Sequence, residues 1–320
     1  MEIITDPVDA NYQVPALRLK NNIIPWIKNH YPKAWSEINK LEKSNRLKSK
    51  IIILIDKTPI NNPKANTRIA EVDCTGQIYI NEGYLAFLWL ISYSLLITWK
   101  ELIHKPLLDG SYGYNLFELK PSVKPFLQYG LNHFLFARTF LVNDINWDER
   151  IYSSPIGSPL DIENQYWGEA NAVFLSAVTF ILLHEIGHIK HDHFRKRYEY
   201  FSKNKTNWLK KLENNSDRYA SRICELKNPN SDISLTKAFG SIVAVCSDLF
   251  LDRYVYRDEH ESADKRIIDR IDSITDDKNS EFYSIGLIAI RLWDLQYQVG
   301  INWNEDINST YEQFLREIVI

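Results

Sequence analysis

Cysteine is scarce in this chain of 320 residues. It occurs only at Cys74, Cys224 and Cys246. These positions are odd in number, lie far apart and form no Cys-x-x-Cys pair, which argues against a disulfide framework and against a cysteine-based zinc site. We therefore expect the chain to work in a reducing compartment, the cytoplasm.

A large excess of charge of either sign is also missing. Lysine and arginine total 38 against 41 acidic residues, which gives a net charge of −3. Nucleic-acid-binding proteins carry a strongly basic face, and these totals do not predict one. The first ten residues, MEIITDPVDA, have neither the basic nor the apolar region of a secretory signal. We expect no nucleic-acid partner and no export by that route.

One segment is apolar enough to need comparison with a membrane span. Residues 85–98 (LAFLWLISYSLLIT) are closed off by Glu82 and Lys100. A spanning helix needs roughly 20 apolar residues, and this segment is shorter. A buried core helix is the favoured interpretation, with peripheral association with a membrane as the alternative.

Strong strand signals are few and lie close together. Residues 51–55 (IIILI) and 77–80 (QIYI) are the best candidates, and residues 68–73 are a third. The later strong segments have the length and apolar pattern of helices, at 84–102, 121–142, 168–193, 207–226, 236–256, 262–273 and 280–297. We predict a mainly α-helical α+β fold with a small β-sheet near residues 50–80. An N-terminal helical extension (1–50) would precede a single domain (51–320).

His184 and His188 stand four residues apart within a strongly apolar segment, residues 169–193. On a helix this spacing puts both imidazoles on one face, where they can bind one metal ion. Glu185 follows the first histidine, so its carboxylate can accept a proton from the attacking water. Gly187 is costly inside a helix unless another element approaches closely. The motif predicts a zinc site with Glu185 as catalytic base, and two structural core histidines are the alternative.

A catalytic zinc ion usually has a third protein ligand. Glu213 and Asp217 lie four residues apart on a predicted helix further along the chain. We predict Glu213 as the third ligand and Asp217 as the acceptor of the second ring N–H of a ligating histidine. An exposed acidic face is the alternative for this pair. His191 and His193 are the rival candidates for the third ligand.

Peptide hydrolysis forms an oxyanion, which needs a donor besides the metal. His260, Arg266 and Tyr219 are candidates, and we favour His260 in the segment HESADKRI as a catalytic residue. A surface histidine within an acidic run is the alternative for His260.

The motif HEIGH (184–188) followed by ENNSDRYA (213–220) resembles that of zincin peptidases whose third zinc ligand is glutamate. Membrane-bound CaaX-processing and heat-shock peptidases are similar at these positions, as are repressor-cleaving peptidases of the ImmA/IrrE type. More of the chain resembles the phage-exclusion peptidase Lit family. That similarity includes residues 84–101, 174–188 and 237–252.

The resemblance covers roughly residues 50–275 and implies that the domain at residues 51–320 has a zincin-like metallopeptidase core. It further implies a zinc endopeptidase of antiphage defence that cleaves elongation factor Tu once a phage-derived segment is bound to it. Its motif carries over His184, His188 and Glu213 as ligands and Glu185 as the base. A repressor-cleaving regulator of the ImmA/IrrE type is one alternative, although no helix-turn-helix module is evident. A non-catalytic scaffold braced by zinc is another, and Glu185 argues against it because a structural site needs no base.

Overall fold

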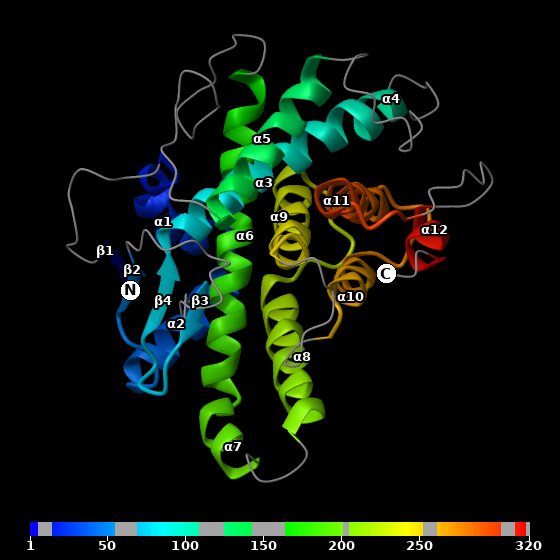
Figure 1. Ribbon diagram of the computed structural model, residues 1–320. Coiled ribbons are helices and arrows are strands. Elements are labelled where there is room, and N and C mark those ends of the chain that lie inside the picture. The colour runs from blue at the N-terminus through cyan, green and yellow to red at the C-terminus, as the bar shows by residue number, and fades with distance from the viewer. Residues whose placement is uncertain are drawn as a thin grey trace.

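A small mixed sheet and the N-terminal helices lie on one side of a long central helix, and further helices lie on the other (Figure 1). The computed structural model describes residues 1–5, 15–54, 69–108, 125–142, 164–200, 205–251, 261–301 and 311–317. Within them the predicted mainly helical α+β fold is confirmed.

The sheet has four strands in the order β1-β2-β4-β3. Strands β1, β2 and β4 are parallel, and β3 runs antiparallel to β4. The three predicted strands are confirmed near residues 50–80, and one further strand comes from the first five residues. The strands are β1 (Glu2–Thr5), β2 (Lys50–Leu54), β3 (Ala70–Val72) and β4 (Ile78–Asn81).

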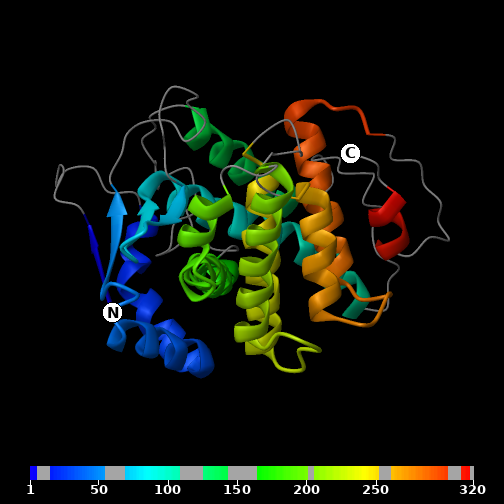
Figure 2. The same ribbon diagram turned by 90° about the horizontal axis from the view of Figure 1, so that it is seen from below.

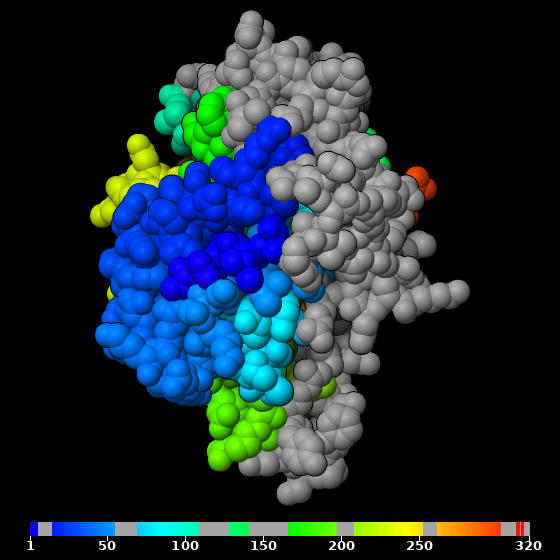
Figure 3. Space-filling view, turned by 90° about the vertical axis from the view of Figure 1, so that its left-hand side faces the viewer, coloured from blue at the N-terminus to red at the C-terminus, as the bar shows by residue number. Residues whose placement is uncertain are grey.

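The rest of the described N-terminal fifty residues is mainly helical. A 3₁₀ turn, η1 (Pro15–Leu19), leads into α1 (Lys20–His30) and α2 (Pro32–Lys43). Helix α1 packs on the central helix α6 (Asn164–Lys190), and α2 contacts both α6 and α8 (Lys205–Cys224). These N-terminal elements form part of one face of the molecule, drawn in blue in Figure 3.

Helix α3 (Glu82–Trp99) begins at Asn81, whose side chain accepts a hydrogen bond from the Tyr84 N–H at 3.1 Å. It continues through a π-helical turn (Lys100–His104) into α4 (Lys105–Leu108). Two segments, 82–108 and 166–190, are long and apolar enough to cross a membrane, but 94% and 83% of their most apolar stretches are buried inside the protein. Burial of that extent is typical of core helices, which agrees with the favoured interpretation of residues 85–98.

Helix α6 packs against α3, α8 and α9 (Asp232–Leu249), and Figure 2 looks along its axis. Helix α9 starts earlier than predicted because Ser231 and Ser234 form a reciprocal capping box. It ends at Leu249, short of the predicted 256. The remaining helices are α5 (Pro125–Val142), α7 (His193–Tyr200), α10 (Ala263–Ile274), α11 (Phe282–Tyr297) and α12 (Tyr311–Glu317).

Gly240 allows the close contact between α9 and α6. A Cβ at this position would lie 2.5 Å from Ser176 Cβ and 2.6 Å from the Val173 carbonyl oxygen. Gly240→Ala is therefore expected to lower the free energy of unfolding by about 1–3 kcal/mol, because backbone must move to make room. Gly168→Ala is the matched control, since nothing lies within 4 Å of its added Cβ. That control should stabilise α6 by up to about 1 kcal/mol. Denaturant unfolding measures the free energy of unfolding of both variants. Equal changes in the two variants would contradict the prediction.

Candidate metal centre

Two neighbouring helices bring three ligand atoms together at one point. Helix α6 supplies His184 and His188, and α8 supplies Glu213. The two histidine Nε2 atoms are 3.2 Å apart, and they lie 3.1 Å and 3.4 Å from Glu213 Oε2. Ligand atoms at about 2.0–2.2 Å from a tetrahedral zinc ion lie about 3.3–3.6 Å from one another, close to the distances here. The spacing of the three atoms therefore fits a single metal ion.

The close approach of α6 and α8 depends on Gly187. A Cβ at Gly187 would lie 3.0 Å from Ser216 Cα and 3.2 Å from Ser216 Cβ. Ser216 itself sits between Glu213 and Asp217 on α8. The backbone contact at this crossing lets the carboxylates of α8 reach the imidazoles of α6, which is the kind of contact that the glycine predicted.

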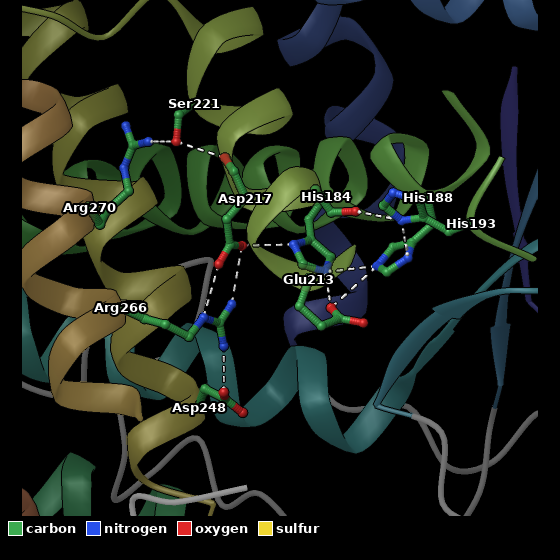
Figure 4. A network of polar contacts seen from close by, with 10 residues as sticks. His184, His188, His193, Glu213, Asp217, Ser221, Asp248, Arg266 and Arg270 are labelled. Carbon is green, nitrogen blue, oxygen red and sulfur yellow. Dashed lines mark hydrogen bonds and ion pairs between the residues drawn. The ribbon is translucent and has the colours of Figure 1, made fainter. Parts of the chain in front are cut away.

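Asp217 holds the side of His184 that faces away from the cluster. Its Oδ1 lies 2.8 Å from His184 Nδ1, which leaves His184 Nε2 for the metal (Figure 4). Arg266 on α10 donates from Nε to Asp217 Oδ2 at 3.0 Å and from Nη1 to Asp248 Oδ2 at 2.6 Å. Burial opposes ionisation of Asp217, but Arg266 and His184 outweigh it and hold the pKa of that carboxyl well below its usual range.

Glu185 lies on the same turn of α6 as the two histidines and is fixed from the sheet. The Val72 N–H, on β3, donates to Glu185 Oε2 at 3.0 Å. Burial raises the pKa of the Glu185 carboxyl above its usual range. A carboxylate whose pKa is raised in this way is better matched to accepting a proton near neutral pH.

These groups line a cleft of about 450 Å³ between the sheet and the helices. Residues 69–73, which contain β3, form one wall. The metal-centre side chains and Phe180 and Val245 form much of the rest. The cleft therefore places space for a ligand beside the three ligand atoms and Glu185.

The other candidate residues have different positions. His260 lies outside the described residues, so its predicted role stays a prediction. Arg266 lines the cleft but is held by two carboxylates, and Tyr219 does not line it. His191 and His193 are not part of the three-atom cluster. Burial, followed by the nearby His188 and His191, lowers the pKa of His193 to about 3, so its ring is neutral.

Two contacts of the site had no signal in the sequence. Asp248 pairs with Arg266, and the Val72 N–H pairs with Glu185. Asp248 lies near the end of α9, and Val72 lies on a strand of three residues. Neither position has a local sequence pattern that points to the metal motif. Both depend on which elements pack together.

Asp217→Asn tests the support of His184. The amide can still meet His184 Nδ1, but it carries no charge and leaves Arg266 with one carboxylate fewer. We expect metal affinity to fall about 10–100-fold, the usual effect of losing such a support. Chelator competition measures the change. Asp232→Asn, on the exposed first turn of α9, is the control and should bind metal like the unsubstituted chain.

Comparison with known protein families points to a peptidase family. A protein-family model described as Peptidase U49 matches residues 78–286, more than half of the chain. The matched segment contains His184, Glu185, His188 and Glu213 as well as Asp217. No curated protein and no solved structure matches the chain.

Proposed function

The chain belongs to the peptidase U49 family, and from this premise we propose that it is a zinc-dependent endopeptidase with its active centre at the metal cluster. The observation that carries the proposal is the set of three ligand atoms 3.1–3.4 Å apart beside the carboxylate of Glu185. Family membership makes the chain a peptidase, and the cluster supplies the metal-dependent chemistry.

The donor set favours zinc among the common metal ions. Two imidazoles and one carboxylate are the protein ligands of many catalytic zinc sites, whereas Mg²⁺ and Ca²⁺ prefer oxygen ligands. When bound there, zinc polarises the scissile carbonyl and makes water a stronger acid. The side chains of His184, His188 and Glu213 are only 12%, 14% and 15% exposed, so the ligands are already largely desolvated.

Glu185 moves the proton. Its Oε2 is held by the Val72 N–H, which leaves Oε1 to accept a proton from the attacking water. The protonated carboxyl then donates that proton to the departing amine nitrogen, so one residue serves as base and then as acid. Fixing one oxygen from β3 keeps the other in a constant position for both transfers.

The wall of the cleft suits an extended peptide. Strand β3 is the last strand of the sheet among the described residues. Its Val72 N–H points away from β4 toward Glu185, so the outer backbone edge of β3 faces the cleft. An extended chain can pair with such an edge through its own backbone. A polypeptide substrate is therefore favoured over a small molecule.

The substrate that we propose is elongation factor Tu, cleaved in antiphage defence when a phage-derived activator is present. The support is the resemblance of residues 84–101, 174–188 and 237–252 to the phage-exclusion peptidase Lit family. All three segments lie within the part of the chain that the family model matches. A cytoplasmic location belongs to the same proposal, since elongation factor Tu works there.

Mapping of new protein N-termini tests the proposal in bacteria that express the unsubstituted chain or Glu185→Gln. Samples are taken before and during phage infection. We expect a cut in elongation factor Tu only with the unsubstituted chain and only during infection. A cut confined to another protein, such as a repressor, would keep the peptidase and reject this substrate. Equal N-termini in both strains throughout infection would argue against the proposed proteolysis.

A further inference from the structure

His193 lies directly behind one of the candidate metal ligands. The chain leaves α6 through a tight turn in which Asp192 adopts a left-handed backbone (φ 57°). This turn folds the His193 ring back toward α6, where its Nδ1 lies 3.1 Å from His188 Nδ1 (Figure 4). His193 is 2% exposed, so the contact is shielded from water.

A metal ion bound at the cluster would fix the proton positions on both rings. Only an unprotonated nitrogen can bind a metal ion, and His188 Nε2 is the atom that faces His184 and Glu213. The proton of His188 therefore sits on Nδ1 and is donated to His193 Nδ1. The proton of a neutral His193 must then sit on Nε2, which has no hydrogen-bond partner in the described part of the chain.

We propose that His193 is a positioning residue that fixes the tautomer and ring orientation of His188 for zinc, an inference that rests on the proposed function. His193 would hold His188 as Asp217 holds His184, whose Nδ1 lies 2.8 Å from Asp217 Oδ1. The Ser216 hydroxyl lies 3.5 Å from His193 Nδ1, too far for a strong hydrogen bond. Without His193, the Nδ1–H of the half-buried His188 would lose this acceptor.

Asp217 and His193 differ in charge, and this difference affects the total charge around the zinc site. Asp217 is a carboxylate whose charge is offset by Arg266. His193 is an uncharged acceptor, so it orients His188 without adding a negative charge near the metal. Glu213 then supplies the one charge among the three ligands, which keeps the ion a strong Lewis acid for the scissile carbonyl.

Two substitutions of nearly equal shape separate positioning from packing. His193→Asn keeps an acceptor, because the Asn Oδ1 takes a place close to that of Nδ1 on the same side-chain frame. His193→Leu has the same branched shape and no acceptor. We expect His193→Leu to lower zinc affinity about 10–100-fold, and His193→Asn to stay within about threefold of the unsubstituted chain.

Competition with a chromophoric chelator measures zinc affinity on the full chain. Thermal melts in excess chelator give the stability of each metal-free variant, so a folding defect is seen separately. Equal zinc affinity in all three chains would overturn this inference and leave the proposed function intact. Loss well beyond 100-fold in both variants would make His193 a direct ligand and also overturn it. If the unsubstituted chain bound no zinc, the proposed function itself would fail.

Discussion

Replacing Glu185 with glutamine is expected to reduce peptide hydrolysis by about 10²- to 10⁴-fold, the usual contribution of a general base. Glutamine has the same shape and can still accept the hydrogen bond from the Val72 N–H, which reaches Glu185 Oε2 at 3.0 Å. It cannot take a proton from water. Metal affinity should hardly change, because Glu185 is not among the three ligand atoms.

Cleavage assays need the natural substrate, because a narrow-specificity peptidase can be inert on generic peptides. Elongation factor Tu with phage-infected cell extract is the first mixture to use, with intact-protein mass as the readout. Metal content is measured on the same preparation. Glu225→Gln, at an exposed position just past the end of α8 and outside the cleft lining, is the matched control and should keep the activity. Full activity of Glu185→Gln would remove Glu185 from the role of base.

Replacing His188 with alanine is expected to abolish stable zinc binding. Only His184 and Glu213 would remain as ligands. A water molecule from solvent binds zinc less firmly than an imidazole that its neighbours hold in place. The unsubstituted chain in zinc at 1,000 times its dissociation constant should be about 4 kcal/mol more stable than the metal-free chain. The His188→Ala variant should show almost none of this difference.

Unfolding with and without chelator measures that difference for each variant. His191→Ala is the matched control, because His191 lies just past the end of α6 and outside the cluster. It should keep the stabilisation by zinc. Equal stabilisation of His188→Ala and the unsubstituted chain would place the metal at a different site.

Much of the fold could be predicted because its signals are local. The apolar periodicity of α6 and the short β-branched run of β2 are each complete within a few turns or residues. Strand β1 was missed because its four residues pair with a strand that begins at Lys50. Pairing between segments so far apart has no counterpart in the local pattern of either one.

The local sequence pattern was sufficient to predict the two histidines on one helix face, with Glu185 beside them, since residues four apart on a helix share a face. It also indicated Glu213 and Asp217, through the same spacing and a family motif. Three contacts became visible only in the folded chain. Glu213 Oε2 meets both Nε2 atoms, Arg266 pairs with Asp217 and Asp248, and His193 lies against His188. The reason is physical: spacing along one helix fixes which side chains share a face, whereas contacts between helices depend on how the whole core packs.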